Sequence, residues 1–181
     1  AGCNGWFSVL SDGRIYLQRD YKFQQQVIDD VTVRLKQIDG ELNWPKPSYT
    51  VASPDIFWTA SSYSRTNRKV HGEMIAQTFQ RLGRPMVSAD DERVNGWMRV
   101  QMLLRNAQDG DPWLIVHPDC RYLMRTLAAA TSDPHNPDDV KFADDHGLAM
   151  LRYGAMSRPT PTGETVIAPY ALTAGNGAKG G

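Results

Sequence analysis

The chain has 181 residues, which is long enough for one domain with a substantial hydrophobic core. Hydrophobic residues make up 41% of it and charged residues 22%, the composition of an ordinary globular protein. Its 20 basic residues balance its 20 acidic ones, so it lacks the overall positive charge expected of a protein that simply coats nucleic acid. A local basic groove around an acidic centre remains compatible with this balance.

The two cysteines, Cys3 and Cys120, do not have the spacing of a zinc site or of a secreted disulfide framework. We therefore expect reduced thiols, as in a cytoplasm. The sequence has no apolar run of transmembrane length and no recognisable signal peptide, so we expect no association with a membrane.

The N-terminal part predicts a β-hairpin followed by a helix. Apolar and aromatic residues on both sides of Asp12 and Gly13, a favoured turn pair, predict two strands within 3–23. Over 24–38, apolar residues recur every three or four positions, which is the period of an amphipathic helix. Gly40 is expected to end this helix, because glycine favours the position after a helix C-terminus.

Strands and helices alternate through the rest of the folded region. The sequence predicts strands over 48–52, 86–89 and 113–116, and helices over 71–82, 92–105 and 120–130. The caps expected for the last two helices are Asp90 or Asp91, and Asp119. The side chains expected on the buried side of the helix over 92–105 are Val94, Trp97, Met98, Met102 and Leu103. This alternation, opened by a hairpin, is typical of an α/β domain with a mixed sheet.

The composition changes near the C-terminus, where Pro, Thr, Gly and Ala dominate and little hydrophobic surface is available. We expect residues 1–158 to form the folded domain and residues 159–181 to form a flexible tail.

Asp55 follows the predicted strand over 48–52 and is the first candidate site residue. A carboxylate directly after a central strand is held rigidly beside a crevice, which is where metal-dependent phosphoryl-transfer sites form. Asp55 is also able to cap the turn that follows it, and an isolated acidic loop residue usually does that. Both interpretations stay open at this point.

Two groups of basic residues are candidate contacts for the phosphate backbone of DNA. Arg65, Arg68 and Lys69 lie in a polar stretch that we expect to form a surface loop. Arg93 and Arg99 lie on the helix over 92–105, from which they are able to face DNA. For both groups the alternative is a solvated surface without a nucleic-acid partner.

The stretch over 144–154 predicts the last helix of the folded region. Asp144 is a suitable N-cap, and His146 and Ala149 lie three positions apart and so share a face. The neighbouring apolar face consists of Leu148, Leu151 and Ala155. By spacing alone, His146 is as compatible with a solvated histidine on a capped helix as with a site.

This stretch, extended to DDHGLAMLRYGAMSRP, resembles the closing motif of the nuclease domain in the large terminase subunits of tailed phages. The family pattern reads roughly Asp-His-x-x-Asp-x-x-Arg-Tyr. The positions that match it or its flanks are Asp145, His146, Arg152, Tyr153 and Gly154. The family's metal-binding aspartate falls on Ala149, whose methyl group cannot ligate a cation. Either this chain has lost that ligand or it is a deliberately inactivated variant.

Three further segments resemble the family in the same order along the chain. They are ASPDIFW at 52–58, GEMIAQTFQRLG at 72–83 and DERVNGWMRVQMLL at 91–104. The resemblance spans about 3–159 and implies a ribonuclease H-like fold, with a mixed central sheet flanked by helices. It assigns the family's second acidic ligand to Asp55, although an alternative alignment places Ser53 there. It also implies a strand before Ala1 that carries the first catalytic aspartate.

As a whole, the resemblance implies a metal-dependent endonuclease domain that cuts concatemeric double-stranded DNA while a genome is packaged into the procapsid. Two Mg²⁺ or Mn²⁺ ions about 3.5–4 Å apart would activate the attacking water and stabilise the leaving oxygen. The implied catalytic and metal-binding residues are Asp55 and His146, with Asp145 a weaker candidate. Because Ala149 replaces an expected aspartate, we expect this chain to bind metal poorly and to cut DNA feebly or not at all.

The implied partners are double-stranded DNA, the terminase ATPase domain, the small terminase subunit and the portal protein, in the cytoplasm of the host cell. The sequence has no GxxxxGK[ST] loop, so we expect the ATPase to lie outside this chain. Two alternatives remain: a catalytically inactive DNA-binding or docking module of the packaging motor, and another ribonuclease H-like nuclease of the resolvase or transposase type.

Overall fold

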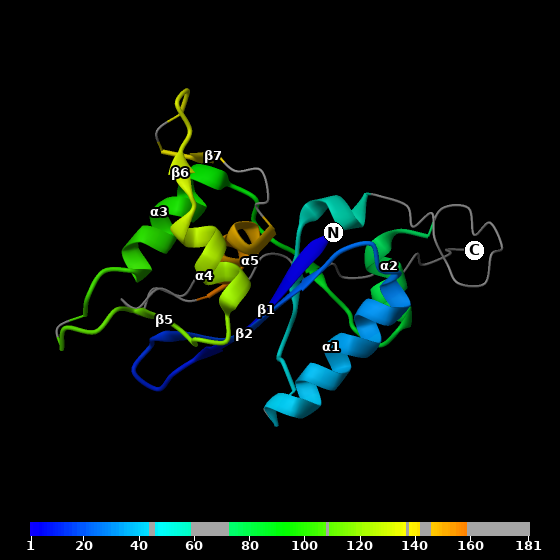
Figure 1. Cartoon of the computed structure of the whole chain (residues 1–181). Helices are drawn as coiled ribbons and strands as arrows, with labels where there is room; N and C mark the ends of the chain where they lie inside the picture. Colours follow the sequence, from blue (N-terminus) through cyan, green and yellow to red (C-terminus); the bar gives the residue numbers. More distant parts are fainter. Residues whose placement is uncertain (44–45, 59–72, 108, 137, 142–145, 159–181) are drawn as a thin grey trace, which may run out of the picture.

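The computed structural model describes residues 1–43, 46–58, 73–107, 109–136, 138–141 and 146–158. Within these ranges the protein is a mixed α/β fold with a small mixed sheet and helices on both of its faces (Figure 1). The α/β class expected from the sequence is confirmed. The tail expected over 159–181 lies outside the described residues, so the domain boundary stays a prediction. No helix in the described ranges is long and apolar enough to cross a bilayer.

The described strands belong to three sheets. The first contains β1 (Gly2–Val9), β2 (Ile15–Phe23) and β5 (Leu114–Val116), the second contains β3 (Val51–Ala52) and β4 (Val87–Ser88), and the third is a ribbon of β6 (Thr131–Ser132) and β7 (Val140–Lys141). β1 pairs antiparallel with β2, whereas β2–β5 and β3–β4 are parallel pairs. Gly13 has a φ of +87° between β1 and β2, a conformation that favours glycine. The predicted hairpin is therefore confirmed.

Five α-helices and one short 3₁₀ turn are described. They are α1 (Ile28–Leu42), η1 (Pro54–Phe57), α2 (Ile75–Arg81), α3 (Arg93–Leu103), α4 (Arg121–Ala128) and α5 (His146–Met156). In Figure 1, α1 and α2 lie on one side of the β1–β2 hairpin, and α3, α4 and α5 lie on the other.

The larger of two hydrophobic cores lies between the first sheet and the helices α3, α4 and α5, and we call it the closed core. Its buried side chains are Ile15, Leu17, Trp97, Val100, Leu103, Leu114, Cys120, Leu123, Leu148, Met150, Leu151 and Ala155. The apolar face predicted for the last helix contributes three of these residues, so that prediction is confirmed. A Cβ at Gly96 would lie 2.3 Å from Cγ of Arg152, so the side chain of Arg152 on α5 occupies the space that a larger residue at position 96 would need.

The smaller core lies on the opposite face of the hairpin, under α1 and α2, and we call it the groove core. Its buried side chains are Trp6, Val31, Leu35, Ile38 and Phe79. Trp6 also donates from Nε1 to Oδ1 of Asp39 at 2.7 Å, which ties β1 to the last turns of α1.

Helix α1 begins and ends four residues later than the range 24–38 expected from the sequence. Gly40 lies within the helix, and Asn43, with φ of 49°, takes the left-handed position at its C-terminus. Asp39 accepts a hydrogen bond of 2.7 Å from Nη1 of Arg84. This tertiary contact holds the last turns helical and overrides the local preference of glycine.

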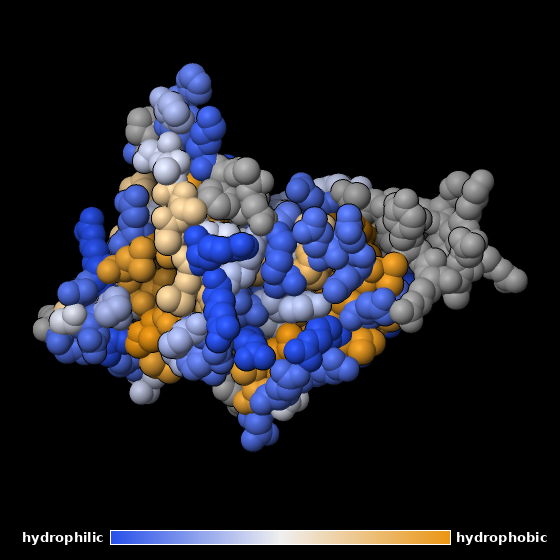
Figure 2. Space-filling model, in the orientation of Figure 1, coloured by the Kyte–Doolittle hydropathy of each residue, from blue (hydrophilic) through white to orange (hydrophobic). Residues whose placement is uncertain are grey.

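The face that α3 buries is only partly the expected one, since Trp97 and Leu103 are buried as predicted but Met98 and Met102 are not. Met98 and Met102 are 56% and 49% exposed, whereas Gly96 and Val100 are buried against the rest of the closed core. The face is set by the close approach of α5 at Gly96, which hydrophobicity along the sequence does not reveal. On the face drawn in Figure 2, apolar surface is visible over the α3 region.

The N-cap residues of α3 and α4 are Glu92 and Cys120, and neither makes a side-chain capping bond. Asp90, one of the two caps expected for α3, accepts from the backbone N–H of Glu92 at 3.0 Å, so that prediction is partly confirmed, whereas the cap expected at Asp119 is wrong. At α4, Oδ2 of Asp20 on β2 accepts from the backbone N–H of Leu123 at 2.6 Å, in the role that had been expected of Asp119.

Candidate functional site

A groove of about 810 Å³ opens between β1 and β3. Its walls come from β1, α1, the segment around β3 and η1, and α5. Among its lining residues are Asp55, Asp91, His146 and Ala149, which come from three separate parts of the chain. The fold therefore places the two predicted catalytic residues and position 149 around one cavity.

Asp55 is an exposed residue of η1, directly after β3. The N-cap of this turn is Ser53, which makes no side-chain capping bond, and the Asp55 backbone carbonyl accepts from the N–H of Trp58 at 3.2 Å. No hydrogen bond or ion pair holds the Asp55 carboxylate within the described ranges. Among the described residues the carboxylate is therefore not engaged by a partner, and no capping bond from it is seen there.

His146 is the first residue of α5, and Ala149 lies one turn further along. Both are partly buried, and both line the groove, as expected for residues that share a helix face. Asp144, predicted as the cap of this helix, and Asp145, predicted as a weaker ligand, lie outside the described residues.

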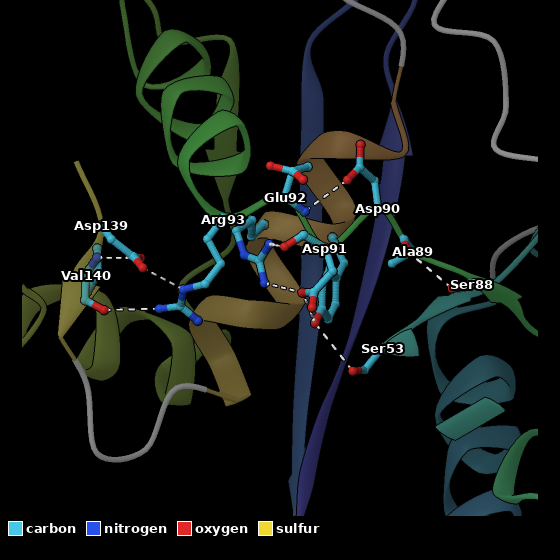
Figure 3. A network of polar contacts seen from close by, with 11 residues as sticks. Ser53, Ser88, Ala89, Asp90, Asp91, Glu92, Arg93, Asp139 and Val140 are labelled. Atoms are coloured by element: carbon cyan, nitrogen blue, oxygen red, sulfur yellow. Dashed lines mark hydrogen bonds and ion pairs between the residues drawn. The ribbon is translucent and has the colours of Figure 1, made fainter. Parts of the chain in front are cut away.

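Asp91 is a groove residue whose role the sequence did not reveal. Arg152, only 2% exposed, donates from Nη1 to the backbone carbonyl of Asp91 at 2.8 Å and from Nη2 to its Oδ1 at 2.7 Å. The Tyr153 hydroxyl donates to the same Oδ1 at 2.8 Å and lies 3.4 Å from Oγ of Ser53 (Figure 3). This network joins the end of β3, the start of α3 and the middle of α5.

Opposing effects act on the pKa of Asp91. Burial by itself raises the pKa, but the hydrogen bonds from Arg152 and Tyr153 and the positive charge of Arg152 outweigh burial and hold the pKa below its usual value. For Tyr153, burial and the neighbouring Asp91 carboxylate raise the pKa of the phenol. At neutral pH the network therefore consists of a carboxylate, a guanidinium and a neutral phenol.

A signal for this network was present in the sequence. Arg152 lies in the otherwise apolar stretch LAMLRYGAM, and a buried arginine almost always has an acidic partner. The pattern does not reveal which acidic residue that partner is, because Asp91 lies 61 positions away.

The structure places the two arginines of α3 in different environments. Arg93 donates from Nε to Oδ2 of Asp139 at 2.7 Å and from Nη2 to the carbonyl of Val140 at 3.2 Å, which ties α3 to the β6–β7 ribbon. Arg99 is only 8% exposed, and burial lowers its pKa. The expectation that Arg99 lies on an exposed face is wrong, because α5 determines which side of α3 is buried.

The basic residues expected in a loop, Arg65, Arg68 and Lys69, lie outside the described residues.

The described groove fits only part of a two-ion site. Within the described part of the chain, no group of three or more His, Cys, Asp and Glu side chains is placed to hold a metal ion. Asp55 offers a carboxylate with no partner among the described residues, Asp91 is already bonded to Arg152 and Tyr153, and Ala149 offers no ligand atom. Mg²⁺ and Mn²⁺ prefer several oxygen ligands, which these residues do not supply together.

No family model matches this chain, and no curated protein sequence matches it. Among solved structures, it is similar to the large terminase of a thermophilic bacteriophage, solved in complex with ATP-γ-S, with a TM-score of 0.57 and 12% sequence identity. The match covers 82% of this chain and 34% of the terminase, so the chain spans about a third of that protein's length. At this identity the likeness concerns the fold: the chain shares its fold with part of a phage large terminase.

Proposed function

We propose that this chain is a nuclease-type domain of a phage large terminase subunit, with a ribonuclease H-like fold, and that it engages double-stranded DNA during genome packaging. The main support is that Asp55, His146 and Ala149, which the sequence resemblance aligns with the family's catalytic centre, border one groove. The fold likeness to a phage large terminase supports the same proposal. In this setting the domain works in the host cytoplasm with the terminase ATPase domain, the small terminase subunit and the portal protein.

In a complete domain of this kind, two Mg²⁺ or Mn²⁺ ions would supply activation of water and stabilisation of charge on the phosphate. In this chain, the exposed carboxylate of Asp55 is the described side chain best placed to hold a cation, and His146 lines the same groove. Because position 149 is alanine, the wall of the groove that α5 forms has no carboxylate at this position. We propose that this chain is for that reason weakly active or inactive as given.

The test extends the chain by the strand that the resemblance implies before Ala1 and restores the expected ligand with Ala149→Asp. The control carries the same extension with Ala149→Asn, which has the same shape without the charge. We expect the aspartate variant to nick supercoiled plasmid in Mn²⁺ at least ten times faster than the control. Asp55→Asn in the same background should abolish the gain. If the aspartate variant stays inert in both Mg²⁺ and Mn²⁺, the nuclease proposal fails.

A second candidate function is a DNA-binding or docking module that does not cut. Two observations favour it: the methyl group at position 149, and the lack of a group of three ligands within the described ranges. This candidate predicts duplex binding that weakens steeply with salt and does not change on addition of EDTA, even in the Ala149→Asp variant. A preference for branched over linear duplex in the same assay would instead indicate a resolvase-type domain.

A further inference from the structure

The arginines that line the groove differ in whether an acidic residue balances their charge. Among the described residues there are four of them, and three form ion pairs of 2.7 Å: Arg84 with Asp39, Arg93 with Asp139, and Arg152 with Asp91. The fourth, Arg158, forms no ion pair with an acidic residue within the described ranges. Its positive charge therefore faces the groove without the compensation that the other three have.

Aromatic rings hold Arg158 in place of a carboxylate. Its Cζ atom lies 6.0 Å from the centroid of the Phe7 ring and 5.1 Å from that of the Tyr49 ring. The Phe7 ring lies against Gly154, where any Cβ would overlap it. The Tyr49 hydroxyl donates to the backbone carbonyl of Ser157 at 2.6 Å. These contacts bring β1 and the segment before β3 against the end of α5, and all five residues line the groove.

This arrangement leaves the edge of the guanidinium available for a ligand. Contacts with aromatic rings use the flat faces of the group, whereas its N–H donors lie in its plane. Nε of Arg158 is buried and has no hydrogen-bond partner among the described residues. Buried donors without an acceptor are uncommon in folded proteins, so this one is consistent with an acceptor that a ligand supplies.

The ligand that suits such a group is an anion with paired oxygens. The planar fork of donors on arginine matches a phosphate in this way, and arginine holds its charge at any ordinary pH. The same groove carries Asp55 and His146, which the proposed function assigns to a nuclease centre. A backbone phosphate of DNA is therefore the anion that the surroundings of Arg158 favour.

We propose that Arg158 binds a backbone phosphate of the DNA strand at a distance from the phosphate that lies at Asp55 and His146. This inference rests on the proposed function and adds to it a contact that positions the strand without taking part in the chemistry. Because the contact acts in binding, it does not depend on the residue at position 149, and the natural chain is suitable for testing it.

The length of α5 indicates which phosphate this is. Arg158 lies 12 positions after His146, the first residue of α5, which corresponds to about 18 Å at the rise of a helix. Phosphates of one strand follow one another at about 3.4 Å along the axis of a duplex. The phosphate at Arg158 is then about five nucleotides from the one at His146.

The test measures binding of a fluorescent duplex of about 20 base pairs by anisotropy, in EDTA and over a range of salt concentrations. We expect Arg158→Gln to raise Kd about ten-fold and to reduce the slope of log K against log salt by about 0.9, the value for one phosphate contact. The matched control is Arg121→Gln, at an exposed residue of α4 that does not line the groove. It removes the same charge, and we expect it to change Kd by less than about two-fold.

Two further variants separate the charge of Arg158 from its placement. Arg158→Lys keeps the charge but lacks the planar fork, so we expect the salt slope to stay and Kd to rise about three-fold. Tyr49→Leu removes one ring that holds the guanidinium, and we expect a similar loss of affinity with an unchanged slope. Thermal unfolding first establishes that each variant is folded.

A readout on the natural chain avoids mutation of the site. The side-chain Nε–Hε signal of Arg158, assigned by its loss in Arg158→Lys, should shift as unlabelled duplex is added and should saturate at the same Kd. An unchanged signal at saturating duplex would overturn the proposal.

The outcomes distinguish this proposal from the proposed function. If the natural chain binds duplex but Arg158→Gln and Arg121→Gln weaken binding equally, the assignment to Arg158 fails and the proposed function stands. If the natural chain does not bind duplex even at low salt, both fail.

Discussion

The closed core and the groove core lie on opposite faces of one hairpin and differ in how completely they are filled. The closed core draws its side chains from β2, β5, α3, α4 and α5, and Leu17, Leu123 and Leu151 within it are completely buried. The groove core has similarly buried residues, such as Val31 and Leu35, yet both also line an open cavity. Burial from solvent is therefore a poor guide to how tightly a side chain is packed in this protein.

The comparison also separates stability from function. The closed core fixes the positions of α3, α4 and α5, and Asp55, His146 and Ala149 border the groove, which is less completely filled. A cavity beside the exposed carboxylate of Asp55 and the side chain of His146 is suited to binding, and the packing of α5 on the closed core keeps His146 in place.

The largest effect should come from matched leucine truncations in the two cores. We expect Leu151→Ala to lower the free energy of unfolding by about 3–4 kcal/mol, because it creates a cavity in a filled region. Leu35→Ala should cost only about 2 kcal/mol, because part of its surroundings is already empty. Urea unfolding of both variants measures the difference, and equal losses would contradict the distinction between the cores.

The next largest effect on stability concerns the ion pair between Asp91 and Arg152, which joins the start of α3 to α5. Asp91→Ala leaves the guanidinium of Arg152 buried without its carboxylate partner. We expect a loss of about 1–2 kcal/mol, below the usual cost for a buried pair because the Asp91 side chain is 55% exposed and solvent screens its charge. Tyr153→Phe, which removes only one hydrogen bond to Asp91, should cost about 1 kcal/mol or less. A loss from Tyr153→Phe larger than that from Asp91→Ala would contradict this assignment.

A smaller effect should appear in the pH dependence of stability. The pKa of Asp91 is lower in the folded chain than its usual value, so the unfolded chain takes up a proton first as the pH falls. The stabilisation from Asp91 is fully present above the unfolded pKa of about 4 and is lost as the pH falls through the folded pKa. In acid titrations followed by urea unfolding, Asp91→Asn should show a shallower loss of stability below about pH 5 than the natural chain.

The smallest effect is kinetic and compares two thiols of the closed core, one at its edge beside the groove and one inside it. Burial raises the pKa of both Cys3 and Cys120 to about 12, so both should react slowly with iodoacetamide at mildly alkaline pH. Cys3 lines the groove and is only partly buried, whereas Cys120 is fully enclosed in the closed core. We expect Cys3 to be alkylated at least ten times faster, as measured by mass spectrometry of the digested protein. Similar rates would indicate that the closed core opens as readily as the groove.

Local sequence signals predicted much of the fold. The turn pair at Asp12 and Gly13 indicated the hairpin, and the apolar period in the last helix indicated its buried face correctly. The alternation of strands and helices predicted the α/β class. These features depend on residues close together in the chain, for which turn and helix preferences are strong.

Features that depend on distant contacts were missed or placed wrongly. The end of α1 is fixed by Arg84, and the buried face of α3, which includes Arg99, is fixed by α5. Of the candidate site, the sequence resemblance named Asp55, His146 and Ala149, which border the groove, but it did not reveal Asp91. A pairing across 61 positions leaves no periodic trace in a single sequence.

The crossing of α3 over α5 at Gly96 implies a dependence among three positions. Cγ and Cδ of Arg152 pass where a side chain at 96 would be, and only by that route does the guanidinium arrive at Asp91. Among homologues we therefore expect positions 91, 96 and 152 to change together: a bulkier residue at 96 should accompany a shorter, uncharged residue at 152 and the loss of the acid at 91.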